Sequence, residues 1–431
     1  MKMTKSKLSS SFWVALTLFS LLGQIAWVVE NMYLNVFLYK MFHATAGEIS
    51  LMVSLSAVTA TVTTVLVGAL SDKLGRRKVF ISGGYILWGI SILAFLLLRE
   101  DVLSAAFPMA ASAAAVGVTL TVVLDCVMTF FGSSANDAAF NAWLTDRASG
   151  DSRGAAEGVN AMMPLVAILA VFGGFMAFDL DKAESWSLIF AIIGGLVIVA
   201  GILGFFLIRE DRVAPATEGY FKTVIHGFRP STVKKNLSLY FTLAVFVLFN
   251  ISIQIFMPYL ILYYEVSLGM ADYVLIMAPA ILLASAFTAF WGRVYDRKSF
   301  AFSSALPLLW LGIGYLLLFF FRSAVPVFLG SLFMMCGYLS GMAVFGAKIR
   351  DLIPEGKAGM FQGVRIFSQV LIPGVVGPMI GTLVLSGAET VKNSDGTESF
   401  VPNAFIFLAA LLALLLPVAL LLIRHFTRKA K

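Results

Sequence analysis

The chain is built from apolar stretches of about 20 residues, which recur along nearly its whole length and are each long enough to cross a bilayer. Hydrophobic residues make up 60% of the 431 residues and charged residues only 13%, a balance far from that of soluble domains. We therefore expect an all-α polytopic membrane protein with twelve transmembrane helices. Their predicted ranges are 12–37, 47–70, 79–98, 119–145, 155–178, 185–208, 236–264, 271–292, 301–321, 326–348, 361–385 and 402–423.

The distribution of basic residues tests this count, because cytoplasmic loops carry an excess of Lys and Arg. With both termini in the cytoplasm, all but five of the 31 Lys and Arg residues fall inside. The five outside are Lys40, Arg99, Lys182, Arg322 and Lys392. The sequence therefore predicts a multi-pass protein of the cell (plasma or inner) membrane. The net charge of +7 follows from this topology and from anionic lipid at the inner surface, and it needs no nucleic acid.

One charged turn appears twice, each time at the cytoplasmic end of a predicted span. The copies, 224 residues apart, read Gly68-x-x-x-Asp72-Lys73-x-Gly75-Arg76-Arg77-Lys78 and Gly292-x-x-x-Asp296-Arg297-Lys298. A second pair, 205 residues apart, is Asp146 with Gly154-x-x-x-Gly158-Val159 and Asp351 with Gly359-x-x-x-Gly363-Val364. Two halves with matching turns are typical of secondary transporters, whose substrate site lies near the membrane midplane.

The repeat predicts an N-terminal six-helix bundle over 1–208, a cytoplasmic linker over 209–235 and a C-terminal six-helix bundle over 236–431. Because the two offsets differ, the first half carries extra chain at about 99–118, either an extended helix end or an apolar outer loop. The polar segment 386–401 is expected to be a solvated loop without function.

The first turn resembles the signature loop between spans 2 and 3 of the major facilitator superfamily, and the second turn is a weaker copy. This resemblance implies two pseudo-symmetric six-helix bundles that work by alternating access. Physically, such an aspartate can pair with a helix N-terminus or with an Arg of a neighbouring span and so hold an inner gate shut. The predicted cytoplasmic gate residues are Asp72, Arg76, Arg77, Asp146, Asp296, Arg297 and Asp351. The alternative is that these basic residues only set the orientation in the membrane.

A finer resemblance lies at the end of span 4 and in span 1. The segments Asn136-Asp137-x-x-Phe140 and Asn31-x-Tyr33-Leu34 are similar to the glycoside–pentoside–hexuronide:cation symporter family, which includes the melibiose carrier. By this resemblance Asp137 contacts a sugar. Two departures argue against sodium coupling: span 2 has no carboxylate over 60–64, and span 1 has an amide, Gln24, where the resemblance implies an acid.

Three acids fall within predicted spans, where an ionisable group is costly and is a functional candidate by default. Asp137 lies roughly 13 Å from the cytoplasmic end of span 4, and Glu30 about 9 Å beyond the centre of span 1. Asp125 is expected roughly 30 Å up, in water at the outer rim. Asp137 is either a substrate ligand or coupling acid, or it makes an interhelical hydrogen bond that only supports packing. Because burial disfavours the charged form of an acid, Glu30 is a proton-coupling candidate, with a structural hydrogen bond as the alternative.

Sugar sites combine carboxylates and amides, which bond hydroxyls, with aromatic faces that stack on the ring. Aligning Tyr33-Leu34 with Tyr259-Leu260 brings Gln24 onto Asn250, two amides at the centres of equivalent spans. The predicted substrate ligands are Asp137, Gln24, Asn250, Trp27, Asn141 and Gln254. The alternative for the amides is that they only join helices. Basic residues at the inner ends of spans 10 and 11 are expected to be gate or lipid-headgroup charges: Lys348, Arg350 and Arg365.

The leading hypothesis is a proton-coupled symporter of a sugar or glycoside, acting as a monomer. The alternative is a proton-coupled exporter of drug-like or amphipathic small molecules. An enzyme is not expected, since the sequence has neither a His-Glu-x-x-His nor a Gly-x-Ser-x-Gly motif. All three histidines lie outside the predicted spans, so we expect no metal site and no cofactor. A ligand sensor would need a soluble output domain, which is not evident.

Overall fold

A computed structural model describes residues 9–108, 112–148, 153–209, 225–354, 358–393 and 397–429. Within these residues, twelve helices are long and apolar enough to cross a membrane, so the predicted number is confirmed. They are Ser10–Phe42, Ala46–Ser71, Arg77–Leu97, Ala113–Arg147, Ala155–Phe175, Ala183–Leu207, Leu237–Ser267, Val274–Arg297, Phe300–Phe320, Ala324–Leu352, Gly363–Leu385 and Phe405–Thr427. Each overlaps its predicted range, and the all-α polytopic fold is as expected.

Contacts between residues divide the chain into two units. Unit 1 comprises Met1–Phe42 and Thr59–Lys222, and unit 2 comprises His43–Val58 and Thr223–Lys431. Helix α3 (Ala46–Leu74) therefore gives its first residues to unit 2 and the rest to unit 1.

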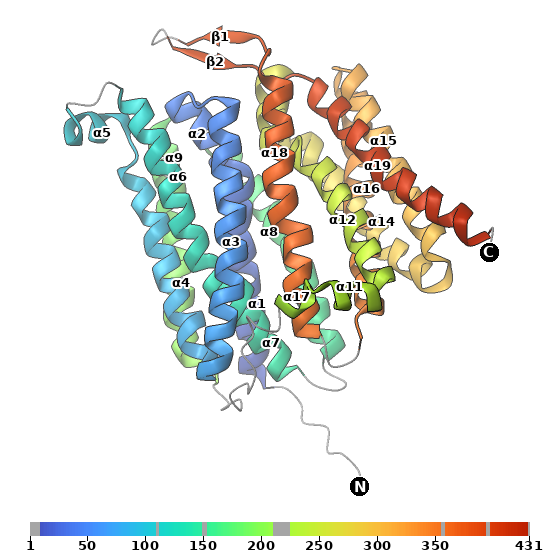
Figure 1. Cartoon of the computed structure of the whole chain (residues 1–431). Coiled ribbons are helices and arrows are strands. Elements are labelled where there is room, and N and C mark those ends of the chain that lie inside the picture. Colours follow the sequence, from blue (N-terminus) through green and yellow to red (C-terminus); the bar gives the residue numbers. More distant parts are fainter. Residues whose placement is uncertain are drawn as a thin grey trace. The chain divides into compact units, whose positions relative to one another are not determined.

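Unit 1 consists of helices that pack side by side, with α4 against α6 and α9 (Figure 1). Its remaining elements are α1 (Ser10–Val28), η1 (Val29–Tyr33), α2 (Leu34–Phe42), α4 (Arg77–Ala94), η2 (Phe95–Leu97), α5 (Glu100–Ala106), α6 (Ala113–Gly132), η3 (Ser133–Phe140), α7 (Asn141–Arg147), α8 (Arg153–Phe175) and α9 (Ala183–Leu207). Segments η1 and η3 are π-helical turns inside spans 1 and 4.

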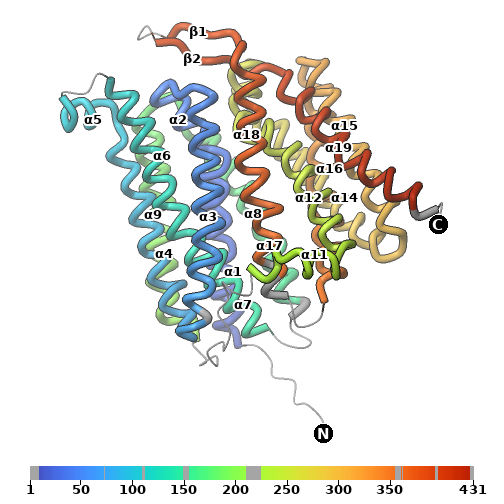
Figure 2. The backbone as a smooth tube through the Cα atoms, in the orientation of Figure 1, coloured from blue at the N-terminus to red at the C-terminus, as the bar shows by residue number. Residues whose placement is uncertain are grey.

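Unit 2 has the same helical character, with a small β-hairpin between α18 and α19 (Figure 2). Its remaining elements are α11 (Pro230–Lys235), α12 (Leu237–Gln254), η5 (Met257–Tyr259), α13 (Leu260–Leu262), η6 (Tyr263–Ser267), α14 (Val274–Arg297), α15 (Phe300–Phe320), α16 (Ala324–Leu352), α17 (Ala358–Ile366), η7 (Phe367–Leu371), α18 (Ile372–Leu385), β1 (Thr390–Lys392), β2 (Glu398–Phe400) and α19 (Phe405–Lys429). The start of α3 is tied into this unit, because Tyr259 and Thr382 donate to the Ala46 carbonyl at 3.0 and 3.1 Å.

Serine residues begin several of these helices. Ser9, Ser112 and Ser299 precede α1, α6 and α15, and each hydroxyl accepts from the backbone N–H three residues on, at 3.3 to 3.4 Å. Such N-caps satisfy donors that a helix start leaves unpaired.

Small residues allow the closest helix pairs to form. A Cβ added to Gly89 of α4 would lie 2.6 Å from the Gly194 carbonyl oxygen of α9. A Cβ on Gly337 of α16 would lie 2.5 Å from the Leu311 nitrogen of α15. Only glycine permits this backbone approach, as is common between helices in membranes.

Two segments that were expected to be loops, or were left undecided, contain secondary structure. The extra chain at 99–118 forms the short helix α5 and the start of α6, with 109–111 outside the described residues. The expected loop 386–401 contains an antiparallel hairpin in which Thr390 pairs with Phe400. Most of the predicted linker, 210–224, lies outside the described residues.

Candidate functional site

Span 4 carries a polar side chain at every fourth position through its middle. These residues are Asp125 and Thr129 on α6, followed by Ser133 and Asp137 on η3. Residues four apart lie next to each other on one helix face, so the four side chains form a continuous polar ladder. The hydroxyl of Ser133 donates to Asp137 Oδ2 at 3.0 Å.

Glu30 of η1 joins the ladder from span 1. The Thr129 hydroxyl donates to Glu30 Oε1 at 2.7 Å, and the two residues are only 0% and 6% exposed. The sequence suggested no partner for Glu30, and the structure places the Thr129 hydroxyl of span 4 against it. The prediction for Asp125, a wet position at the outer rim, is wrong. Because α6 begins at Ala113, six residues before the predicted start, Asp125 lies about 18 Å inside the helix and is buried.

Asp137, the leading substrate-ligand candidate, is half-buried. Its neighbour Asn136 is fixed by a chain of hydrogen bonds, since Asn136 Nδ2 donates to the Tyr85 hydroxyl at 2.6 Å and Tyr85 donates to the Phe19 carbonyl at 2.6 Å. Gly23 of α1 lies against this chain, and a Cβ there would be 2.7 Å from the Tyr85 hydroxyl oxygen. Asn136, Tyr85 and Gly23 thus set the position of η3, a role that was missed in the sequence.

A cluster of aromatic rings lies along α1 and α4 in the same unit. The rings of Trp27 and Trp88 are 5.1 Å apart, and that of Trp88 is 5.4 Å from Tyr85. A Cβ on Gly132 would be 2.7 Å from the Trp88 ring, so glycine makes room for the pair. The indole Nε1 atoms of Trp27 and Trp88 are buried with no hydrogen-bond partner among the described residues. Trp27 therefore packs against Trp88, and its indole N–H is available to donate a hydrogen bond to a ligand.

The predicted amide ligands occupy different settings. Gln24 is half-buried on α1, three residues before Trp27. Asn141 is exposed, and its amide donates to the Asp137 carbonyl of its own helix at 3.2 Å. Asn250 is buried in unit 2 and donates to the Phe246 carbonyl at 2.8 Å, while Gln254 packs where Gly377 of α18 approaches α12. A site that combines Asn250 and Gln254 with the residues of unit 1 stays a prediction.

Unit 2 contains a span acid that was missed. Glu265 is half-buried in the π-helical turn η6, because span 7 extends to Ser267 whereas its predicted end was 264. The described spans contain four π-helical turns, and three of them carry an acid: Glu30 in η1, Asp137 in η3 and Glu265 in η6. Single π turns inside α-helices are frequent at functional sites.

The first charged turn is held by an ion pair. Arg77 Nε lies 3.2 Å from Asp146 Oδ2, and the same guanidinium donates to the Ser71 hydroxyl. Arg77 is 7% exposed, whereas the adjacent Arg76 is exposed. The side chain of Asp72 lies outside what the structure describes.

The second turn is held differently. The Tyr295 hydroxyl donates to Asp351 Oδ2 at 2.5 Å, while Asp296 and Arg297 are exposed. Under the repeat offsets, Tyr295 stands at the position of Ser71 and Asp351 at that of Asp146. In unit 2 the Tyr295 hydroxyl thus contacts the aspartate directly, whereas in unit 1 Arg77 links Ser71 to Asp146.

Within the described residues, no group of three or more His, Cys, Asp or Glu side chains could hold a metal ion.

Comparison with known proteins agrees with this architecture. The similar solved structures include the nucleoside transporter NupG, with a TM-score of 0.70 at 11% identity, covering 97% of this chain and 99% of that one. A bacterial homologue of the human lysosomal transporter Spinster gives a TM-score of 0.69 at 15% identity over 97% and 96% of the chains. The xylose transporter XylE from E. coli gives 0.66 at 16% identity over 95% and 96%. No curated protein matches the sequence.

At these identities the structures establish the fold alone. The sequence itself matches the family model of the Major Facilitator Superfamily over residues 11–378, which is most of its length. This chain therefore belongs to the Major Facilitator Superfamily of membrane transporters.

Proposed function

We propose that this transporter is a proton-coupled symporter that moves a sugar or glycoside by alternating access, as its resemblance to the glycoside–pentoside–hexuronide:cation symporters implies. The observation that carries the proposal is the half-buried carboxyl group of Asp137 at a π-helical turn, on the same polar ladder to which the buried Glu30 is bonded.

Asp137 has the chemistry of a sugar ligand, because a carboxylate accepts paired hydrogen bonds from neighbouring hydroxyls. Trp27 adds an aromatic face and Gln24 an amide that donates and accepts, both half-buried on α1. We also assign Asn250 and Gln254 as amide ligands, because an amide can donate to and accept from hydroxyls. Asn141 is the weakest ligand, since its amide is bonded to its own helix.

The ladder also has the chemistry of a proton site. A charged carboxylate within a span costs about 3 kcal/mol on insertion scales, so protonation removes a cost that opposes movement of the helix. Thr129 and Ser133 carry hydroxyls, which both donate and accept and can join Glu30 to Asp137 by hydrogen bonds. We assign proton coupling to Glu30 and Asp137.

The proposal places the protein in the cell membrane as a monomer with both termini in the cytoplasm. In this proposal the N-terminal bundle 1–208 and the C-terminal bundle 236–431 are joined by the cytoplasmic linker 209–235. The Arg77–Asp146 and Tyr295–Asp351 contacts hold the two cytoplasmic turns and change when the carrier opens inward.

The test is uptake by proteoliposomes that contain the purified protein, with a panel of labelled monosaccharides, disaccharides and glycosides and an imposed pH gradient. Uptake driven by an inwardly directed proton gradient is expected, and Asp137→Asn and Glu30→Gln should abolish the dependence on the gradient. The matched control is Glu184→Gln, an exposed carboxylate at the start of α9, which should leave uptake unchanged.

Uptake that retains its proton dependence in both Asp137→Asn and Glu30→Gln would overturn the assignment. If no sugar is taken up but proton-driven efflux of amphipathic dyes is observed, the alternative of an exporter replaces the proposal.

A further inference from the structure

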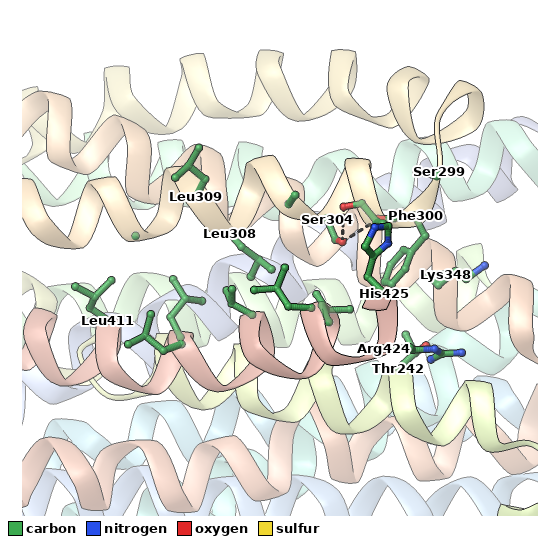
Figure 3. A pocket seen from close by; sticks show the side chains of 18 of the residues that line it. Thr242, Ser299, Phe300, Ser304, Leu308, Leu309, Lys348, Leu411, Arg424 and His425 are labelled. Atoms are coloured by element: carbon green, nitrogen blue, oxygen red, sulfur yellow. Dashed lines mark hydrogen bonds between the residues drawn. The ribbon is translucent and has the colours of Figure 1, made fainter. Parts of the chain in front are cut away.

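A cavity of about 760 Å³ lies within unit 2, among α12, α15, α16 and α19. None of the residues proposed for substrate, proton coupling or the turns lines it. Its polar and apolar parts are at opposite ends: Figure 3 shows Lys348, Arg424 and His425 near Ser299 and Ser304, with Leu308, Leu309 and Leu411 farther along.

The polar end is positively charged. Lys348, Arg424 and His425 contribute the ionisable groups, and none of the described residues that line the cavity is acidic. Arg424 donates to the Ser238 hydroxyl at 2.8 Å and lies 4.3 Å above the Phe241 ring. Lys348 Nζ lies 5.7 Å from the Phe300 ring centre. These contacts hold the Lys348 and Arg424 side chains at this end of the cavity.

The remainder of the cavity is an apolar groove between α15 and α19. Leu308 and Leu414 form its floor and are 4% and 2% exposed, whereas Leu309 and Leu415 on its rim are 57% and 54% exposed. From Ser299 to Leu316 the wall rises about 26 Å along α15, more than the roughly 15 Å of one leaflet's hydrocarbon layer. An extended acyl chain fits along such a wall.

We propose that this groove binds one anionic phospholipid, with its phosphate at Lys348, Arg424 and His425 and an acyl chain between α15 and α19. Basic pockets between transmembrane helices bind acidic headgroups, and each basic residue near the surface favours an anionic lipid. A zwitterionic lipid would bring its ammonium group toward three basic side chains. A small soluble anion would leave the leucine wall uncovered.

The test is lipid competition on the full-length protein in detergent, read by native mass spectrometry. Phosphatidylglycerol and phosphatidylcholine with identical acyl chains are added together, and glycerol phosphate is added in a separate arm. We expect a preference for phosphatidylglycerol that the double variant Lys348→Gln/Arg424→Gln lowers on the order of tenfold. The matched control Lys234→Gln/Lys235→Gln removes two exposed charges of α11 and should keep the preference.

A second variant tests the apolar wall. A Cβ on Gly312 would only touch Leu411 and Leu414, at 3.5 and 3.7 Å, so Gly312→Phe should fill the groove and lower retention of both lipids. Equal retention of the two lipids by the unmodified protein would overturn the proposal. So would an unchanged preference in Lys348→Gln/Arg424→Gln, or displacement of phosphatidylglycerol by equimolar glycerol phosphate. Transport of sugar is not part of this readout, so the two proposals fail separately.

Discussion

The hydroxyl of Thr129 lies 2.7 Å from Glu30 Oε1, although the two residues are 99 positions apart in the chain. Both are buried, so this contact joins spans 1 and 4 through a carboxylic acid and a neutral donor. The contact therefore holds the acid of span 1 against the polar face of span 4.

Replacing Thr129 with valine keeps the side chain's shape and removes the donor. Because Glu30 then loses a buried hydrogen bond, we expect the free energy of unfolding to fall by about 1–3 kcal/mol. Proton-dependent uptake should fall with it. Thermal unfolding in detergent and the uptake assay measure the two effects. Thr119→Val is the control, since Thr119 is exposed and its hydroxyl donates to the Ala115 carbonyl of its own helix.

Tyr85→Phe should destabilise the protein by about 1–3 kcal/mol, because the Asn136 amide and the Phe19 carbonyl lose the hydroxyl that joins them. Since Asn136 precedes Asp137, substrate affinity should weaken as well. Tyr338→Phe removes a hydroxyl for which no hydrogen bond is found in the described chain, and it should change neither quantity. Equal stability of the two variants would show that the Asn136–Tyr85 bond does not hold η3.

Adjacent glycines on α4 offer a test of packing against η3. A Cβ on Gly84 would lie 2.7 Å from the Ala135 Cβ, whereas a Cβ on Gly83 would have no atom within 4 Å. Gly84→Ala should cost about 1–3 kcal/mol through overpacking and displace the Asp137 turn. Gly83→Ala should be neutral or slightly stabilising. Unfolding curves measure the stability of the two variants. A Gly83→Ala variant less stable than Gly84→Ala would contradict the packing of α4 on η3.

The Arg77–Asp146 pair is best measured by a double-mutant cycle. Arg77→Ala and Asp146→Ala should show a coupling energy of about 0.5–3 kcal/mol, because the guanidinium side chain is only 9% exposed. Arg76 is exposed, so the same cycle with Arg76→Ala in place of Arg77→Ala should give a coupling energy near zero. Additive effects of Arg77→Ala and Asp146→Ala would mean that the contact contributes nothing to stability.

The Tyr295–Asp351 bond in unit 2 leads to a kinetic prediction. Tyr295→Phe removes a hydrogen bond to an exposed carboxylate, a contact that water screens to about 1 kcal/mol or less. Because this bond lies at a turn and outside the proposed substrate residues, the maximal transport rate should change while the KM for substrate stays within about twofold. Asp296→Asn, at the exposed neighbour, is the control. A changed KM with an unchanged rate would place Tyr295 in binding instead.

The twelve spans and the all-α fold follow from the amino-acid sequence alone. Length and apolarity are local properties, and the repeated turns around Asp72 and Asp296 mark the two halves without reference to any contact. The sequence also singled out Asp137 and Glu30, because an acid in an apolar stretch is conspicuous.

The contacts of these acids, in contrast, depend on how the helices pack. Thr129, Tyr85 and Gly23 look unremarkable in sequence and gain their roles only when spans 1, 3 and 4 pack together. Span ends shifted by a few residues were enough to misplace Asp125 and to hide Glu265. The four-residue period of polar residues from Asp125 to Asp137 can be seen in the sequence. The contact between this period and Glu30 of span 1 cannot. Hydropathy records the cost of placing each residue in lipid, whereas a hydrogen bond between distant residues depends on which helix faces meet.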